Sequence, residues 1–238
     1  QYDVIVIGAG VTGAMTAYQL SRYQLRVCVV DKRLEPAAET SSANSGVVHA
    51  GYDAKPGSNK ARLNVRGNAL MEEACHALDV PFKRTGKLVV GFDEKDRENI
   101  LKFKKIGEIN GVRGMEMIDR KRMDEIDPNA GGNFAMYVPS SGILDPMQYT
   151  IALAENACAN GVCFRFGHKV ERISRLEDGW MLHTSKGDVK TKWVINCAGM
   201  YASQISAMLG YPEYPVRGFK GEYYVLDKKA GKNMPIPI

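Results

Sequence analysis

A glycine-rich turn near the N-terminus constrains the fold of this chain more than any other feature. The turn, Gly8-Ala9-Gly10-Val11-Thr12-Gly13, follows a β-branched apolar run at residues 4–7 and opens a segment with helical spacing at 11–23. A second apolar run follows at residues 26–30. Strand, helix and strand in so short a stretch predict a right-handed βαβ unit whose parallel strands are buried on both faces.

This turn has the composition that a dinucleotide needs. Gly8 permits the tight turn, Gly10 lets the backbone approach a pyrophosphate, and Gly13 lets the helix pack closely on the strand. The phosphates would meet the N–H groups at the start of the helix, those of Val11 and Thr12 included. The alternative is that the glycines serve only a turn.

The end of the second strand supplies the next candidates for cofactor binding. Asp31 stands 18 residues after Gly13 and is placed to accept hydrogen bonds from an adenosine ribose, with Lys32 beside it. In the alternative interpretation, Asp31 only ends a strand. The motif does not by itself distinguish NAD from FAD.

The chain after Asp31 departs from the βα alternation of an NAD-binding domain. A polar loop at residues 39–52 precedes predicted helices at 56–79, 94–109, 120–127 and 146–159, with a strand at 86–92. Residues 163–190 predict an antiparallel meander with turns at Asp178-Gly179 and Lys186-Gly187. The buried parallel pattern returns at residues 192–199, and a late strand is predicted at 223–227.

Composition narrows the class of protein. Apolar residues make up 45% of the chain, and the net charge of +5 comes from basic residues spread along it, so we expect no nucleic-acid partner. The five cysteines show no metal-binding spacing, which predicts a reduced, cytoplasmic protein without a metal. No apolar run is long enough to span a membrane. Peripheral attachment to the inner face of a membrane, or to a partner subunit, stays open.

Several longer stretches resemble the FAD-dependent oxidoreductases related to D-amino-acid oxidase. The opening "DVIVIGAGVTGAMTAYQLSRYQLRVCVVDK" is similar to the start of that superfamily. The stretches "NSGVVHAGYDAKPGSNKARLNVRGN", "GKLVVGF", "SGILDP" and "WVINCAGMYA" resemble the branch of glycerol-3-phosphate dehydrogenases and L-2-hydroxyglutarate oxidases. Members of this branch are longer, so the chain resembles their N-terminal portion.

The resemblance implies an α/β fold: a Rossmann-like parallel sheet that binds FAD, an antiparallel β-meander, and part of an α+β substrate domain. It assigns residues 1–80 and 140–210 to the FAD-binding domain, and residues 81–139 and 211–238 to an incomplete substrate domain.

The resemblance also implies the cofactor contacts. The small and polar side chains of the 39–52 loop would cradle the flavin, the ribitol and the pyrophosphate; they are Ser41, Ser42, Asn44, Ser45 and Gly46. The backbone of Val170 would read the adenine edge. The turn Cys197-Ala198-Gly199 would approach the pyrophosphate.

The catalytic assignment is an expectation that rests on the resemblance. His49 would take a proton from the substrate hydroxyl while hydride passes to flavin N5. It could instead support the cofactor or carry a covalent flavin link. Arg217 and Lys220 are candidates to bind an anionic substrate, or else solvated charges at a strand edge.

The implied reaction oxidises a secondary alcohol, and its electrons leave to a quinone, a partner subunit or oxygen. Glycerol 3-phosphate is the first candidate substrate, L-2-hydroxyglutarate the second and an amine the third. A non-catalytic FAD-binding module of a larger enzyme is an alternative of a different class, and an NAD dehydrogenase is disfavoured by the loop and the meander.

Overall fold

The computed structural model describes residues 1–212, 214–222, 229 and 235–238. The chain divides into two compact units, Gln1–Ser45 with Pro146–Gly221, and Gly46–Asp145 with Glu222–Ile238. The functional domains expected from the sequence stay a prediction, because compactness alone does not test them. The strand predicted at 223–227 lies outside the described residues.

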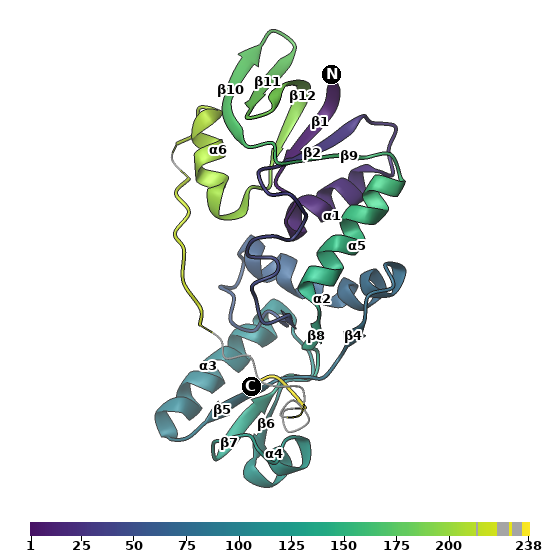
Figure 1. The fold of residues 1–238 in the computed structure, drawn as a ribbon. Helices are drawn as coiled ribbons and strands as arrows, with labels where there is room; N and C mark the ends of the chain where they lie inside the picture. The colour runs from purple at the N-terminus through teal and green to yellow at the C-terminus, as the bar shows by residue number, and fades with distance from the viewer. Residues whose placement is uncertain (213, 223–228, 230–234) are drawn as a thin grey trace. The chain divides into compact units, whose positions relative to one another are not determined.

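The first unit is built on a six-stranded sheet in the order β10-β11-β12-β1-β2-β9 (Figure 1). Its strands are β1 (Tyr2–Ile7), β2 (Val27–Asp31), β9 (Cys163–Phe166), β10 (Val170–Leu176), β11 (Gly179–Thr184) and β12 (Gly187–Asn196). The pairs β12-β1, β1-β2 and β2-β9 are parallel, whereas β10, β11 and β12 pair antiparallel. The predicted Rossmann-like sheet with a meander is confirmed.

One boundary of the predicted meander is wrong. Cys163–Phe166 was expected inside it, but β9 joins the parallel edge beside β2, with Cys28 opposite Cys163. The parallel pattern expected from residue 192 is confirmed within one residue: β12 is a single strand from Gly187, which pairs antiparallel with β11 up to Thr191 and parallel with β1 from Thr191 onward. A short strand with alternating residues has the same sequence pattern in either kind of ladder.

Alternation along β1 divides the core of this unit between the two faces of the sheet. Val4 and Val6 belong to the apolar cluster that includes Ala17 of α1 (Val11–Leu20) and Ala157 of α5 (Pro146–Ala159). Ile5 and Ile7 belong to a second cluster, with Ile205 of α6 (Ala202–Met208). Figure 1 shows α1 and α5 side by side. Both faces of the parallel strands are therefore buried, as the continuous apolar runs predict.

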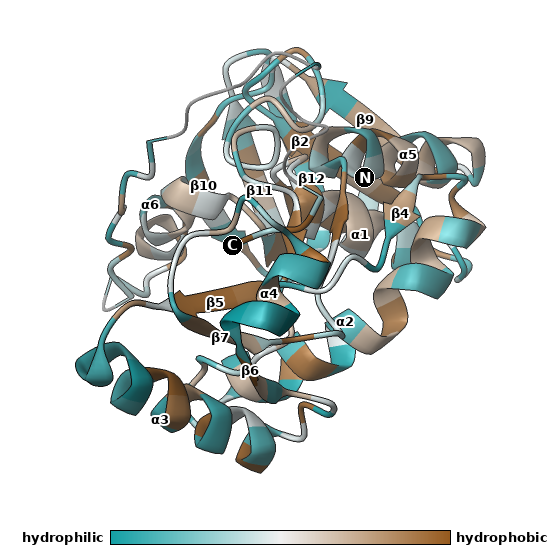
Figure 2. Ribbon diagram, turned by 90° about the horizontal axis from the view of Figure 1, so that it is seen from below, coloured by the Kyte–Doolittle hydropathy of each residue, from teal (hydrophilic) through white to brown (hydrophobic). Residues whose placement is uncertain are grey.

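The second unit contains two three-stranded sheets. The first has the order β3 (Val47–Val48), β8 (Gly142–Leu144), β4 (Phe82–Lys83). The second has the order β5 (Leu88–Gly91), β7 (Phe134–Tyr137), β6 (Glu116–Asp119), and all of its pairs are antiparallel. In Figure 2, β5 and β7 are coloured as hydrophobic strands. Leu88, Met136 and Val138 are fully buried here, so this sheet is the core of the unit.

The helices of the second unit are α2 (Asn59–Ala77), α3 (Glu94–Asn110) and α4 (Arg120–Ile126). Polar side chains fix where they begin. Ser58 Oγ accepts from the Ala61 N–H, which places the start of α2 after the Pro56-Gly57 pair that was expected to open it. Asp93 and Asp119 cap α3 and α4 in the same way. Such caps satisfy backbone donors that a helix leaves without partners.

None of the helices in the described part of the chain is both long enough and apolar enough to cross a membrane.

Candidate functional site

The glycine turn between β1 and α1 is packed so closely that side chains are excluded at two of its positions. Gly8 has φ +107°, and a Cβ on it would lie 2.4 Å from the carbonyl oxygen of Cys197. A Cβ on Gly13 would lie 1.8 Å from the carbonyl oxygen of Gly8. Gly10 differs, since a Cβ there would meet only the Ser41 hydroxyl, at 3.1 Å. Gly8 and Gly13 are needed for packing, whereas Gly10 keeps space open in front of the turn.

A cavity of about 900 Å³ lies in the first unit in front of this turn. Its walls come from Gly8 and Gly10, the end of β2 with the residues after it, residues 38–41, residues 167–171, and the segment from Cys197 to Met208. The carboxyl ends of parallel strands are where open α/β sheets bind ligands. The volume lies within the range of small-molecule and cofactor sites, about 300–1,000 Å³.

Asp31 sits at the end of β2 and lines this cavity. One carboxylate oxygen accepts from the Ala9 N–H at 2.6 Å, and the other accepts from the Arg33 N–H at 2.7 Å. A carboxylate has about four lone-pair sites, so each oxygen keeps capacity for another donor. Asp31 therefore ties the glycine turn to β2 and can still accept hydrogen bonds from a ribose diol.

The loop that follows β2 contributes one of its predicted residues to the cavity wall. Ser41 lines the cavity, and its hydroxyl accepts from the Val11 N–H at 2.9 Å, at the first residue of α1. Ser42 and Asn44 donate within the loop, to the carbonyls of Glu39 and of Thr40 and Ser41. Thr12 and Ser45 are exposed, and Gly46 opens the second unit with φ +67°. Of the five predicted loop residues, only Ser41 lines the cavity.

A charged cluster forms one edge of the cavity. Lys32 Nζ lies 3.1 Å from a Glu39 carboxylate oxygen, which Arg33 also contacts at 2.7 Å. The same ammonium lies 3.2 Å from the centre of the Tyr201 ring. Sequence reasoning named Lys32 and missed Glu39, Arg33 and Tyr201. Their signals were the basic pair directly after Asp31 and the aromatic residue in the "CAGMYA" stretch.

Val170 and the turn Cys197-Ala198-Gly199 also line the cavity, whereas the predicted positions Val11, Thr12 and Gly13 of the glycine turn do not. The Cys197 N–H donates to the Ile7 carbonyl at 2.9 Å, which extends the β1–β12 pairing to the turn. Burial raises the pKa of the Cys197 thiol, so it is a poor nucleophile. Ala198 and Gly199 follow in the cavity wall, and Val170 lies where β10 is irregular before Arg172. The structure thus brings Val170 of β10 and the three predicted residues after β12 to one cavity.

His49 belongs to the second unit, in the loop between β3 and α2. Although the residue is exposed, desolvation by surrounding protein lowers the pKa of its imidazole, and the positive charge of Lys87 lowers it further. Asp53 acts in the opposite direction. The neighbouring Tyr52 is buried, and burial raises its pKa to about 12. His49 is therefore biased toward the neutral form, which can accept a proton.

Arg217 and Lys220 lie in an exposed segment of the first unit that forms neither helix nor strand. Neither residue belongs to the cavity lining. The strand-edge placement considered for them is wrong in the described residues 214–222. Their role as anion-binding residues stays a prediction.

Among the described residues, there is no group of three or more histidine, cysteine or acidic side chains placed to hold a metal ion.

The residues of the first unit fit a dinucleotide. The space in front of Gly10 is open apart from the Ser41 hydroxyl, so a phosphate could approach the backbone of the turn there. The cavity offers a carboxylate for a ribose at Asp31, and apolar walls for a base at Ile7, Val30 and Met208. The basic side chains of Lys32 and Arg33 lie at its edge, where they would favour an anionic ligand. This arrangement does not choose between dinucleotides.

Comparisons with known proteins bear on that choice. The model of the DAO family, described as FAD dependent oxidoreductase, matches residues 3–238. A glycerol 3-phosphate dehydrogenase of Caloramator mitchellensis is 41% identical over 232 residues, which are 97% of this chain and 48% of that protein. A mitochondrial L-2-hydroxyglutarate dehydrogenase of Caenorhabditis elegans is 34% identical over 234 residues, 95% of this chain and 54% of that protein.

A solved structure agrees with these similarities. L-alpha-glycerophosphate oxidase of Mycoplasma pneumoniae, with FAD bound, matches at a TM-score of 0.82 and 30% identity. The match covers 87% of this chain and 56% of that one. The chain thus spans about half the length of the relatives it matches.

Proposed function

Since the chain belongs to the DAO family of FAD-dependent oxidoreductases, we propose that it takes part in oxidising the secondary alcohol of a small anionic substrate. Glycerol 3-phosphate, converted to dihydroxyacetone phosphate, is the first candidate. The single observation that carries this choice is the 41% identity, over 97% of the chain, to a glycerol 3-phosphate dehydrogenase. The activity, the substrate and the electron acceptor all belong to the proposal.

The first unit would hold the cofactor. Gly8, Gly10 and the N-terminus of α1 would receive the pyrophosphate, with Ser41 free to exchange its bond to the Val11 N–H for one to a phosphate oxygen. Asp31 would accept hydrogen bonds from the adenosine ribose, and the backbone at Val170 would meet the adenine. FAD, when bound, accepts the two electrons that leave the substrate carbon.

His49 would remove the proton of the substrate hydroxyl. A base acts best when its pKa lies near the working pH and its neutral form is populated. Desolvation and Lys87 both favour the neutral imidazole, which supports this role. The proton moves from the hydroxyl oxygen to an imidazole nitrogen, and from there to solvent, since the residue is exposed.

The substrate is expected to carry a negative charge. Arg217 and Lys220 are our candidates to bind it, because an arginine fork or an ammonium compensates a phosphate or carboxylate. The acceptor would be a quinone, a partner subunit or oxygen. Association with a membrane surface or a subunit is part of the same proposal.

L-2-hydroxyglutarate is the second candidate, because a dehydrogenase for it is 34% identical over 95% of the chain. It shares with glycerol 3-phosphate a secondary alcohol beside an anionic group. A purely FAD-binding module, without activity of its own, is the alternative from another class.

The test begins with the visible absorption spectrum of the purified protein, repeated on the supernatant after acid precipitation. Flavin bands that acid releases would support non-covalent FAD; bands that stay in the pellet would support a covalent link. Glycerol 3-phosphate and L-2-hydroxyglutarate are then added without oxygen. Bleaching by one of them identifies the substrate. A protein that holds FAD and is bleached by neither would favour the binding-module alternative.

A further inference from the structure

We propose that Asn68, together with Asn64, is a positioning residue for His49. Both asparagines lie on α2 and donate from their side-chain amides to the backbone carbonyl of His49, at 3.1 Å and 3.0 Å. The inference deepens the proposed function and rests on its assignment of His49 as the base. It adds the residues that hold the base in place.

The loop around His49 needs such support because little regular structure holds it. The strand before it, β3, has only two residues, Val47 and Val48, and its ladder to β8 ends at Val48. The next helix begins at Asn59. Loop carbonyls without ladder partners must find donors elsewhere or stay in water. The asparagine amides of α2 supply these donors to the carbonyl of His49, the residue whose position the proposed reaction requires to be fixed.

Asn68 is the stronger of the two anchors. It is buried, with 7% of its surface exposed, and its amide also donates to the Ser140 carbonyl at 2.9 Å. That carbonyl lies just before β8, the strand that pairs with β3. One amide group thus joins the His49 loop, α2 and the approach to β8. The two N–H donors of this amide lie closest to the carbonyls of His49 and Ser140, and the Val48 carbonyl lies within reach at 3.4 Å.

Arg84 determines which way the Asn68 amide faces. Its guanidinium donates to Asn68 Oδ1 at 3.2 Å and to Glu72 Oε2 at 3.2 Å. With the oxygen of Asn68 engaged by Arg84, the NH₂ group must face the carbonyls. An aspartate at this position would keep the bond to Arg84 but would place a carboxylate oxygen against carbonyl oxygens.

The functional consequence follows from the precision that proton transfer requires. A base must lie within hydrogen-bond reach of the proton it removes, and a displacement of about 1 Å can cost roughly a hundredfold in rate. A loop held at the His49 carbonyl itself allows less displacement of the imidazole than one held at its ends.

The test compares Asn68→Asp and Asn64→Ala with the unchanged, FAD-loaded protein. We expect Asn68→Asp to lower the rate of flavin reduction by substrate at least tenfold, with a smaller change in KM, and Asn64→Ala to lower it about threefold to tenfold. Asn64→Ala removes a single bond from a half-buried residue, so it keeps the test usable if Asn68→Asp does not fold.

Two controls separate positioning from general stability. Asn133→Ala removes another asparagine amide bond to a carbonyl, 2.7 Å from Phe92 O, away from the His49 loop. Met123→Val lowers stability from a fully buried site in a different apolar cluster. Each control variant is compared with the asparagine variant whose Tm is nearest to its own. If the control slows flavin reduction as much, the loss of rate comes from lost stability, and the positioning role of Asn68 is wrong.

A measurement without substrate distinguishes this proposal from the proposed function. The imidazole of His49 is titrated by NMR in each variant. Positioning predicts that Asn68→Asp and Asn64→Ala change the His49 pKa and broaden its signals, and that both controls leave them unchanged. Unchanged His49 signals in the asparagine variants would overturn the positioning role. If the signals change while His49→Asn reduces flavin at the normal rate, the positioning stands and the assignment of His49 as base fails.

Discussion

The Lys32 ammonium lies 3.2 Å from the centre of the Tyr201 ring and 3.1 Å from a carboxylate oxygen of Glu39. Glu39 belongs to the loop after β2, and Tyr201 ends the short 3₁₀ helix Gly199–Tyr201. Lys32 therefore joins two edges of the cofactor cavity that are distant in sequence.

Replacing Lys32 should weaken cofactor binding. Lys32→Met removes a positive charge from the edge of the cavity, and it removes the contacts that fix Glu39 and Tyr201 there. We expect the Kd for FAD to rise roughly tenfold. Flavin fluorescence, followed while FAD is added to the apoprotein, measures it.

Lys190→Met is the matched control for this prediction. Lys190 is also partly exposed and paired with a carboxylate, that of Asp178 at 3.1 Å, but it does not line the cavity. Its replacement should leave FAD binding unchanged. Equal affinities for FAD in the two variants would contradict the role given to Lys32.

Two glycines of the same turn should respond differently to alanine. At Gly13 the added methyl would lie 1.8 Å from a backbone oxygen, so Gly13→Ala should unfold or strongly destabilise the first unit. At Gly10 it would meet only the movable Ser41 hydroxyl, and φ is −72°, a value that alanine accepts. Gly10→Ala should therefore keep its Tm within a few degrees and lose FAD affinity by at least tenfold. Circular dichroism melting measures the Tm of each variant, and FAD titration measures its affinity for the cofactor. A Gly10→Ala protein with normal FAD affinity would argue against a pyrophosphate at this turn.

The part of the site that sequence reasoning found is the part built from local contacts. Gly8, Gly13 and Asp31 lie in one βαβ unit, where the spacing of strand, turn and helix fixes which atoms meet. The geometry of these residues can be predicted from about thirty consecutive positions. The same holds for the apolar runs of β1 and β2, whose burial on both faces follows from their composition.

The part that sequence reasoning missed depends on contacts between distant segments. Lys32, after β2, contacts Tyr201, after β12, and Asn68 donates to the carbonyls of His49 and Ser140. The periodicity of a sequence does not predict contacts between residues so far apart. From sequence alone, an asparagine on a helix is predicted to face solvent, and only the structure shows that a carbonyl lies beside it. The parallel position of Cys163 was missed for the same reason, since strand pairing is decided far from the strand itself.

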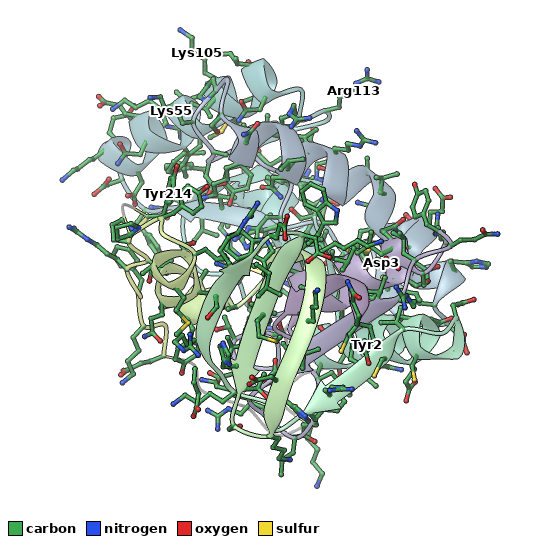
Figure 3. All side chains as sticks on the ribbon, turned by 90° about the horizontal axis from the view of Figure 1, so that it is seen from above. Tyr2, Asp3, Lys55, Lys105, Arg113 and Tyr214 are labelled. Carbon is green, nitrogen blue, oxygen red and sulfur yellow. The ribbon has the colours of Figure 1, made fainter. Side chains whose placement is uncertain are left out.

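Asp3 should make stability depend on pH in acid. Its carboxylate, at the start of β1 (Figure 3), lies 2.8 Å from Lys192 Nζ and 3.4 Å from Arg26 Nε. The hydrogen bond with Lys192, followed by those from Arg26, holds the Asp3 pKa well below its usual range. A carboxylate with a lowered folded pKa stabilises the protein above its unfolded pKa, about 3.9, and this contribution is lost as pH falls through the folded value.

Asp3→Asn tests this dependence. The denaturation midpoint of the variant should lie below that of the unchanged protein by a constant amount between about pH 5 and 8, and the difference should shrink below about pH 4. Asp178→Asn, which loses one partner, Lys190, should show the same trend with a smaller difference. A difference for Asp3→Asn that persists undiminished at the lowest pH would show that charge is not its cause.

The charges around His49 should set the pH dependence of flavin reduction. The neutral imidazole is the base, so the rate should rise with pH and level off above the His49 pKa. Desolvation and Lys87 lower that pKa from its ordinary value, while Asp53 raises it. Lys87→Met removes a positive charge that disfavours the imidazolium, so the His49 pKa and the midpoint of the pH–rate profile should both move upward. Asp53→Asn should move both downward.

The size and origin of these shifts can be checked within one set of variants. Lys60→Met should move the midpoint upward by less than Lys87→Met, because Lys60 is the weakest of the causes that act on His49. Lys105→Met changes the net charge equally, but the Lys105 side chain extends outward from α3 (Figure 3), so the midpoint should not move. The profiles are measured by stopped-flow reduction of the bound flavin, and the His49 pKa by NMR. A profile that moves while the His49 pKa stays fixed would mean that another group is the base.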